Sequence, residues 1–352
     1  MRNLVNIGDM SKSWWDGLYS RCCDIIERPG DFVDSCRGKV LASLFFEPST
    51  RTNFSFQAAC MRLGGSVFGF SNPLETSVSK GETLADTIRV ASCYADTVVI
   101  RSPLEGAATA AALYSEVPVI NAGDGGHFHP TQTLADLTTI ARYRGGIGGF
   151  CIGLCGDLKY GRTVHSLIMA LSHFFEISFC LISPPELRAP QYMLDFMREH
   201  GQQYIEVERL DECLGMLDIL YMTRVQSERF TDKSEYENVR GVYVLTKSLL
   251  DGAKRDMIVM HPLPRDGEIA PEVDADSRAV YFEQARNGMF IRMALLLEFL
   301  HAPRQMPGLT PAGGLFECVN EVCVTRKERY LPPLRSSGGD DRCGYCDKNI
   351  VY

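Results

Sequence analysis

Short apolar runs alternate with segments of helical periodicity along most of this 352-residue chain, and this alternation limits the possible fold more than any other feature. Runs such as 40–46, 97–100, 150–154 and 257–260 have the length and apolar character of buried strands. Alternation of strands with helices predicts parallel sheets covered by helices. Polar residues gather where these strands end, so we expect ligands to bind at the carboxyl edges of the sheets.

The length of the chain and its glycine-rich and proline-rich stretches indicate where its domains begin and end. A chain of this length with 45% hydrophobic residues can fill two ordinary domains and carry a small appendage. The glycine-rich stretch 144–149 lacks apolar periodicity and therefore marks a joint. We expect an α/β fold of two doubly wound parallel-sheet domains joined by helices, plus a small C-terminal zinc-binding domain. The predicted parts are a first domain at 1–145, a second domain at 146–275, a helix at 276–302 that packs back on the first domain, a linker at 303–314 and the small domain at 315–352.

Charge, hydropathy and cysteine usage exclude several kinds of partner. The formal net charge of -8 and a pI near 5.5 argue against nucleic acid as the main partner. The chain has no run of 18 apolar residues and no signal-peptide core, so we expect no membrane association. Nine of the 13 cysteines are scattered through residues 22–213 in mostly apolar settings, which is typical of reduced thiols in a cytoplasmic protein.

The turn after the first predicted strand concentrates groups that bind anions. Pro48 ends the strand, and Ser49, Thr50, Arg51 and Thr52 open the helix that follows. The unpaired backbone N–H groups and the dipole at a helix N-terminus favour an anion. Three hydroxyls add donors, and the guanidinium adds a planar fork that is always charged. An ordinary N-cap, for which one Ser or Thr suffices, is the alternative interpretation.

More basic and polar residues stand at the ends of other predicted elements. They are Lys80, Arg101, His129, Gln132, Arg162, Arg224, Gln226 and Arg265. Taken singly, an arginine at a strand end is more often half of a surface salt bridge, but together these residues suit substrates with several negative charges. The sequence has no nucleophile elbow, Walker loop, dinucleotide fingerprint or metal-spaced histidines. We therefore expect catalysis by positioning and charge stabilisation, without a catalytic cofactor.

Seven motifs resemble those of the catalytic chains of the aspartate carbamoyltransferase family, in the same order. They are F-E-P-S-T-R-T, K-G-E-T-L-A-D-T, R-S-P, H-P-T-Q-T-L-A-D-L, G-D-L-K-Y-G-R-T-V-H-S-L, Y-M-T-R-V-Q and H-P-L-P-R. The resemblance covers about residues 5–302. It implies transfer of a carbamoyl group from carbamoyl phosphate to L-aspartate, which yields N-carbamoyl-L-aspartate and phosphate on the route of de novo pyrimidine biosynthesis.

The resemblance also implies a role for each matching residue. The set implied to contact carbamoyl phosphate is Ser49, Thr50, Arg51, Thr52, Arg101, His129, Gln132, Leu263 and Pro264. The set implied to contact aspartate is Lys80, Arg162, Arg224 and Gln226. The set implied to act in catalysis is Arg51, Thr52, Lys80, Arg101 and His129.

The loop that carries Lys80 has a further implication. In the resembling family this lysine reaches into the site of a neighbouring subunit, which implies a homotrimer with shared active sites. Either Thr76 or Ser77 would serve as the hydroxyl that the family has in this loop, and both remain candidates.

The sequence leaves two alternatives to this function. The first is carbamoyl transfer to a different amino acceptor. Against ornithine as the acceptor, this chain has H-P-L-P at the turn where ornithine carbamoyltransferases carry a motif like H-C-L-P. An arginine-rich acceptor half would also repel a cationic amine. The second is a catalytically silent assembly subunit, which would require loss of a key residue, and none is lost.

The tail carries four cysteines in a spacing of its own, at Cys318, Cys323, Cys343 and Cys346. Two close pairs joined by a longer loop predict a structural Zn²⁺ site, with disulfides as the alternative. The pattern resembles the zinc domain of the regulatory chains of bacterial aspartate carbamoyltransferases, without their nucleotide-binding half, and implies higher assemblies formed through this domain. A generic zinc ribbon for nucleic acid is the weaker interpretation, because the chain as a whole is acidic.

Overall fold

The computed structural model describes residues 3–225, 241, 243–304, 317–335 and 341–351. The chain divides into two compact units, Met1–Thr131 with Met289–Tyr352, and Gln132–Gly288. Two helices run from one unit into the other, α5 (Pro130–Arg144) and α10 (Tyr281–Phe299). Gln226 and most of the predicted linker at 303–314 lie outside the described residues.

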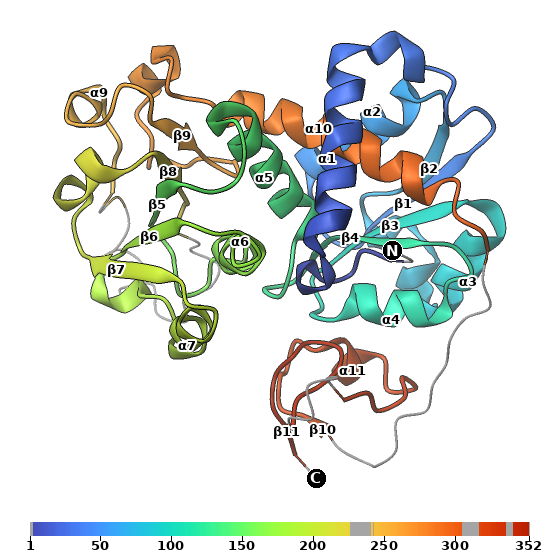
Figure 1. Cartoon of the computed structure of the whole chain (residues 1–352). Helices are drawn as coiled ribbons and strands as arrows, with labels where there is room; N and C mark the ends of the chain where they lie inside the picture. Colours follow the sequence, from blue (N-terminus) through green and yellow to red (C-terminus); the bar gives the residue numbers. More distant parts are fainter. Residues whose placement is uncertain (1–2, 226–240, 242, 305–316, 336–340, 352) are drawn as a thin grey trace. The chain divides into compact units, whose positions relative to one another are not determined.

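The first unit contains a parallel sheet of strand order β2-β1-β3-β4 (Figure 1). Its strands are β1 (Val40–Phe45), β2 (Ser66–Phe70), β3 (Thr97–Ser102) and β4 (Val119–Asp124). Its helices are α1 (Lys12–Glu27), α2 (Thr50–Arg62), α3 (Leu84–Tyr94) and α4 (Ala107–Tyr114). The strands form because almost all residues of β1, β3 and β4 are buried, as parallel strands covered by helices require.

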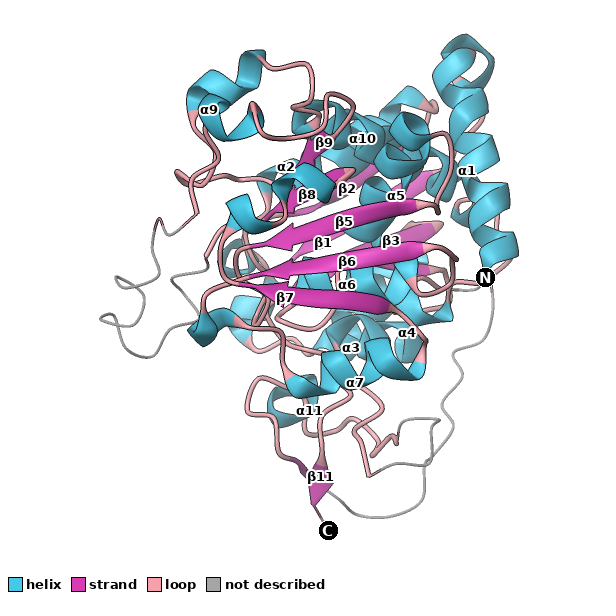
Figure 2. Cartoon of the chain, turned by 60° about the vertical axis from the view of Figure 1, so that its left-hand side comes forward, coloured by secondary structure: helices cyan, strands magenta, loops and turns pink. Residues whose placement is uncertain are grey.

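The second unit contains a parallel sheet of strand order β7-β6-β5-β8-β9 (Figure 2). Its strands are β5 (Phe150–Cys155), β6 (Ile177–Ile182), β7 (Gln203–Val207), β8 (Ile219–Met222) and β9 (Ile258–Met260). Its helices include α6 (Arg162–Leu171), α7 (Gln191–Glu199) and the short α9 (Lys247–Leu250). The two sheets confirm the prediction of two parallel α/β domains.

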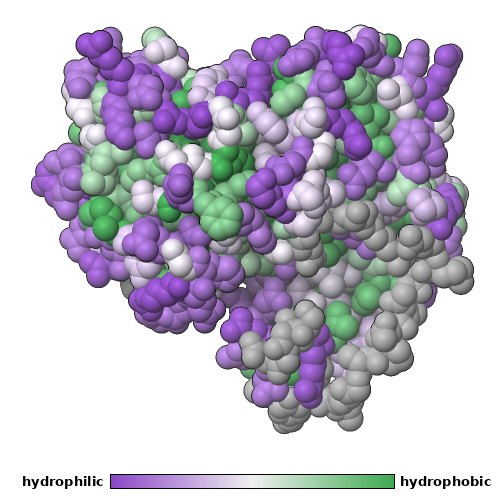
Figure 3. All heavy atoms as spheres, in the orientation of Figure 1, coloured by the Kyte–Doolittle hydropathy of each residue, from purple (hydrophilic) through white to green (hydrophobic). Residues whose placement is uncertain are grey.

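Short 3₁₀ turns complete the described elements. They are Ile7–Asp9, Pro29–Phe32, Pro73–Glu75, Ser77–Lys80, Pro185–Leu187, Leu210–Glu212, Leu214–Met216 and Pro271–Ala275. None of the described helices is long and apolar enough to cross a membrane. On the face seen in Figure 3, hydrophilic side chains cover most of the described surface and hydrophobic ones lie between them.

The helix predicted at 276–302 is shorter than expected, because α10 begins only at Tyr281. The residues before it pair with β9 instead: Val259 donates its amide to the carbonyl of Arg278, and the amide of Val280 donates to the carbonyl of Val259. Backbone groups engaged in this pairing cannot also form the hydrogen bonds of a helix. The apolar periodicity used to predict the helix contains no information about pairing with a distant strand.

The described tail consists of β10 (Glu317–Cys318), α11 (Val324–Lys327), β11 (Ile350–Val351) and loops. Its buried side chains, among them the four cysteines, Val324, Leu331 and Tyr345, belong to the same apolar core as α3 and α4. The tail therefore supplements its small core with that of the first unit, which suits a segment too short to bury enough apolar surface alone.

Candidate active site

The anion-binding turn predicted from sequence lies at the start of α2. Ser49 is the N-cap residue, at φ -156° and ψ 85°, but its side chain makes no capping hydrogen bond. The ordinary N-cap interpretation is therefore wrong. Arg51 is exposed in the first turn of α2, whereas Thr52 is only 8% exposed. Hydroxyls, a guanidinium and the helix N-terminus thus occupy one turn, as a phosphate site requires.

Buried polar contacts hold the start of this helix. Asn53 accepts hydrogen bonds from the hydroxyl of Ser43 in β1 at 3.0 Å and from the side chain of Gln57 at 2.7 Å. Arg292 of α10, which is buried, donates to the hydroxyl of Ser55 at 3.0 Å and to the carbonyl of Thr131 at 3.3 Å. These contacts fix the position of the turn relative to the strand before it.

Arg101 is held at the end of β3 by two partners. One end of its guanidinium forms an ion pair with Glu47 at 2.8 Å, and Nη1 donates to the carbonyl of Ala122 at 3.2 Å. Its buried Nε has no hydrogen-bond partner among the described residues. Burial lowers the pKa of Arg101, and the Glu47 carboxylate opposes that effect. Glu47 was not singled out from sequence, although it belongs to the first motif.

His129 lies beside Arg101 at the start of α5. It is 5% exposed and precedes Pro130, the first residue of the helix. Gly123 stands against both side chains: a Cβ there would lie 2.9 Å from Nη1 of Arg101 and 3.4 Å from Cδ2 of His129. With φ of +119°, Gly123 also adopts a backbone conformation that disfavours other residues. The structure thus brings together Arg101 and His129 as the sequence predicts.

Sheet order explains why the Ser49–Thr52 turn and Arg101 belong to one region. β2 and β3 lie on opposite sides of β1, so the strand order reverses between β1 and β3. Ligands of open parallel sheets bind at such a reversal, beyond the carboxyl ends of the strands. Ser49–Thr52 follow β1, and Arg101 lies near the end of β3.

Lys80 ends the 3₁₀ turn Ser77–Lys80 and is exposed. It makes no hydrogen bond or ion pair with the described residues of its own chain. The hydroxyl of Thr76 donates to the carbonyl of Pro73 at 2.7 Å and accepts from the amide of Val78 at 3.3 Å. Thr76 therefore serves the loop itself, while Ser77 is exposed.

The second unit places its basic residues at an equivalent reversal of strand order, between β5 and β8. Arg162 is the first residue of α6, which follows β5, and Arg224 comes two residues after β8. The hydroxyl of Thr223 accepts from the amide of Asp157 at 3.1 Å, which ties together the turns that carry the two arginines. Gln226 lies outside the described residues.

Asp136 anchors Gln132, and sequence inspection missed this role. Its carboxylate is fully buried and accepts hydrogen bonds from Gln132 at 2.8 Å, Gln284 at 2.7 Å and Tyr221 at 2.9 Å. The only signal in the sequence was its place in the motif H-P-T-Q-T-L-A-D-L. A carboxylate with this many donors holds the amide of Gln132 in one orientation.

A histidine shapes the loop that contains Leu263 and Pro264. His261 contacts Glu268 through Nε2 at 2.6 Å, and its Nδ1 accepts from the amide of Leu263 at 2.8 Å. Leu263 has φ of +50°, a strained conformation for a residue with a side chain. The buried ring thus holds a backbone conformation in which the carbonyls of residues 263 and 264 are fixed.

Arg265, grouped with the substrate-binding arginines from sequence, has a structural role instead. Both ends of its guanidinium pair with Asp274, and Nη1 also donates to Tyr281 at 3.0 Å. The Arg265 guanidinium lowers the pKa of Asp274 to about 2, with a further contribution from the Tyr281 hydroxyl. A side chain engaged in this way is not available to a substrate.

The four tail cysteines form a group that could hold a metal ion. All four are buried, and their sulfur atoms lie within 4.8 Å of one another. The Sγ atoms of Cys318 and Cys346 are 3.4 Å apart, and those of Cys323 and Cys343 are 3.9 Å apart. Both distances are well beyond the disulfide bond length of about 2.0 Å. Four thiolates around a tetrahedral metal at about 2.3 Å lie about 3.8 Å apart. The donor set therefore fits a metal and does not fit disulfides.

The fold and the two groups of basic side chains define a two-unit α/β protein whose cationic residues stand where its parallel strands end, an arrangement that suits anionic substrates. A model of the aspartate/ornithine carbamoyltransferase carbamoyl-P binding domain matches residues 2–142, and a model of the Asp/Orn binding domain matches 148–299. The chain belongs to the aspartate/ornithine carbamoyltransferase family.

Individual relatives agree with this assignment. The aspartate carbamoyltransferase catalytic subunit of Clostridium perfringens is 54% identical over 300 residues, which cover 85% of this chain and 98% of that protein. The catalytic subunit of M. jannaschii aspartate transcarbamoylase is 45% identical, with a TM-score of 0.80, and the match covers 85% of this chain and 98% of that one. The Trypanosoma cruzi enzyme in complex with carbamoyl phosphate and aspartate is 39% identical, with a TM-score of 0.80 and coverage of 84% and 96%.

Proposed function

We propose that the chain transfers the carbamoyl group of carbamoyl phosphate to the amino group of L-aspartate, releasing phosphate and N-carbamoyl-L-aspartate. The observation that carries this proposal is the placement of basic side chains at the strand-order reversal of both sheets. Relatives more than half identical bear the name aspartate carbamoyltransferase, and a related structure binds both substrates. The reaction belongs to pyrimidine biosynthesis.

The first unit supplies the groups that stabilise developing charge. Ser49, Thr50, Arg51 and Thr52 hold the phosphate at the N-terminus of α2, where charge increases as phosphate departs. Arg101 and His129, packed against Gly123, donate to the carbamoyl oxygen and act as an oxyanion site with Thr52. The Glu47–Arg101 ion pair fixes the guanidinium before substrate arrives.

The second unit supplies groups that orient the substrates. Gln132, held by Asp136, and the carbonyls of Leu263 and Pro264 bind the carbamoyl amide. Arg162, Arg224 and Gln226 bind the two carboxylates of aspartate. Two guanidinium groups that are always charged favour a dicarboxylate and oppose the cationic side chain of ornithine.

An acceptor assay tests this function. We expect carbamoyl transfer to L-aspartate at a rate that exceeds transfer to L-ornithine by on the order of 1,000-fold, because a site built for charged partners strongly rejects the wrong charge. The measurement is product formation with aspartate, ornithine and other amino acids at equal concentration. Preference for another acceptor would contradict the aspartate assignment, and no turnover with any acceptor would favour a silent assembly subunit.

We also propose a homotrimer with shared active sites, in which Lys80 and Ser77 serve a neighbouring subunit. The support is an apolar surface next to the loop that carries Lys80, where Leu74 is 77% exposed, Val90 47% and Tyr94 67%. Val90, Tyr94 and Thr76 also line a hollow of about 900 Å³. Exposed apolar side chains around a hollow are typical of surfaces that a partner covers.

For the tail we propose one structural Zn²⁺ bound by Cys318, Cys323, Cys343 and Cys346, in a domain that steadies the assembly. Zinc supplies a four-thiolate crosslink when bound and takes no part in the chemistry. The support is the buried four-sulfur group and the core that the tail shares with α3 and α4.

Replacement of one thiolate tests the metal. Cys343→Ser should reduce bound zinc from one per chain to none, release the tail from α3 and α4 and weaken the oligomer, because the remaining three thiolates cannot close the site. Elemental analysis and sedimentation measure the two effects. Cys23→Ser, a half-buried thiol in α1, is the matched control and should keep its zinc. Full zinc content in Cys343→Ser would show that the metal proposal is wrong.

A further inference from the structure

The tail contacts the segments that carry the oxyanion groups of the proposed site. The backbone of Glu105, just before α4, pairs with the tail on both sides: its amide donates to Val322 at 3.0 Å, and its carbonyl accepts from Val324 at 2.9 Å. The Glu105 carboxylate accepts from Asn320 at 2.7 Å. Gly106 packs so closely that a Cβ would lie 2.6 Å from the Cβ of Tyr345. The loop between β3 and α4 is therefore fitted to the tail.

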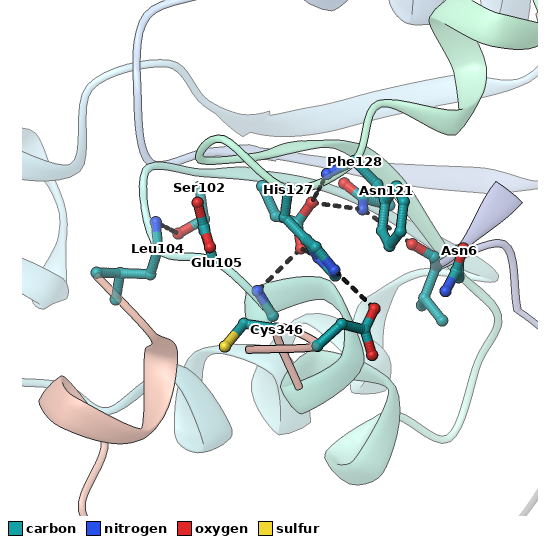
Figure 4. A network of polar contacts seen from close by, with 12 residues as sticks. Asn6, Ser102, Leu104, Glu105, Asn121, His127, Phe128 and Cys346 are labelled. Carbon is teal, nitrogen blue, oxygen red and sulfur yellow. Dashed lines mark hydrogen bonds and ion pairs between the residues drawn. The ribbon is translucent and has the colours of Figure 1, made fainter. Parts of the chain in front are cut away.

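A second contact reaches the loop between β4 and α5. The ring of His127 lies between two carboxylates, with Nδ1 3.1 Å from Asp124 and Nε2 3.0 Å from Asp347 of the tail (Figure 4). Burial lowers the pKa of His127, but the carboxylates, Asp124 above all, outweigh that effect and raise it to about 10. The protonated ring donates from both nitrogens, so Asp347 and Asp124 are linked through it.

Asp124 connects this link to the rest of the loop. Its carboxylate is 2% exposed and accepts from the amides of Gly106 at 2.9 Å and Phe128 at 3.0 Å, and from Asn121 at 3.0 Å. One carboxylate thus joins the two loops that the tail touches. Charge-assisted hydrogen bonds of this kind hold loop geometry more strongly than neutral ones.

The loop that Asp124 holds determines where the oxyanion groups lie. The end of β4, directly before this loop, provides the Ala122 carbonyl that accepts from Arg101 at 3.2 Å, and Gly123, which packs against both Arg101 and His129. His129 follows His127 by two residues. A displacement of the loop would therefore act first on the two groups that polarise the carbamoyl oxygen, because the start of α2 has anchors of its own in the Ser43–Asn53 and Arg292–Ser55 hydrogen bonds.

We propose that Asp347, the residue after the fourth tail cysteine, is a positioning residue for the transfer reaction, and that it acts through His127 and Asp124 to hold Arg101 and His129 in place. This inference rests on the proposed function. By this proposal the tail helps to set the geometry of the carbamoyl phosphate site in its own chain, in addition to any role in assembly.

The test separates transition-state positioning from phosphate binding. Asp347→Asn should lower turnover on the order of tenfold, as loss of a charged hydrogen-bond partner does. Affinity for inorganic phosphate, measured by calorimetry, should change less than about twofold, because phosphate binds mainly at the α2 turn. Zinc content and the thermal unfolding midpoint should match those of the unmodified chain. Glu321→Gln, an exposed tail carboxylate, is the matched control and should behave as the unmodified chain.

A double-mutant cycle shows whether Asp347 acts through His127. His127→Gln and Asp347→Asn together should reduce turnover no further than the more severe single change, because both break one chain of contacts. The His127 N–H signals in spectra of histidine-labelled protein should shift in Asp347→Asn but not in Glu321→Gln.

Three results would contradict the positioning role of Asp347 or the proposed function. An active chain whose Asp347→Asn variant keeps full turnover overturns this inference alone. Parallel losses of turnover, phosphate affinity and thermal midpoint show a merely structural role and also overturn it. A chain that transfers no carbamoyl group in unmodified form overturns the proposed function first, and this inference with it.

Discussion

Arg51→Ala should reduce turnover on the order of 100-fold or more while the chain stays folded, as removal of one key charge-stabilising donor does in other enzymes. Arg51 lies exposed in the first turn of α2, next to the hydroxyls of Thr50 and Thr52. Its guanidinium stabilises the charge that collects on phosphate as the carbamoyl group departs. Steady-state kinetics measure the loss, and circular dichroism checks the fold.

The same helix offers a matched control. Arg62 is exposed in the last turn of α2, away from the proposed phosphate position, and Arg62→Ala should keep nearly full turnover. The comparison isolates position, because both changes remove an exposed arginine from one helix. Near-normal turnover in a folded Arg51→Ala protein would contradict the assignment of the α2 turn as the phosphate site.

Two inactive variants should restore activity to each other when their subunits are exchanged. Lys80→Ala and Arg162→Ala should each lose on the order of 100-fold or more in turnover, because each removes a charged ligand of the substrates. If Lys80 serves a neighbouring subunit, each mixed trimer holds one site without either change, and such sites make up roughly a quarter of all sites in a random equal mixture. Activity after dissociation and reassembly of an equal mixture measures the effect.

The mixing experiment needs its own control. Arg162→Ala mixed with Arg224→Ala should stay inactive, because both arginines belong to the same unit of one chain and no exchange separates them. Mass analysis of tagged subunits verifies that mixed trimers form. Mixed Lys80→Ala and Arg162→Ala trimers without activity would contradict the shared-site proposal.

Local sequence patterns were sufficient to predict those parts of the site whose residues are adjacent in the chain. The S-T-R-T turn follows an apolar run that ends at Pro48, so a strand, a turn and a helix N-terminus could be predicted from adjacent residues. Parallel sheets likewise follow from strand–helix alternation, and the two sheets have that form. The four-cysteine spacing predicted a cluster, and the sulfur atoms do lie together.

Long-range partners could not be predicted in this way. Arg265 and Arg101 look alike in sequence, each at the end of a strand or just after one, yet Arg265 pairs with Asp274, while Arg101 pairs with Glu47 and keeps Nε unpaired among the described residues. Which carboxylate reaches which arginine depends on the neighbouring elements. The anchor role of Asp136 was missed for the same reason, since its other two donors, Tyr221 and Gln284, come from elements far away in the chain.

The sequence by itself determined most of the elements and the family, because periodicity, turn residues and motif order are properties of short segments. Only the tertiary structure decided what holds those segments in place. The tail illustrates the difference: its cysteines predicted a metal site, but nothing in their spacing indicated that Asp347 would meet His127 or that Tyr345 would pack on Gly106. Contacts between distant residues form only when each segment buries its apolar face, and the neighbour that it meets there is set by the fold as a whole.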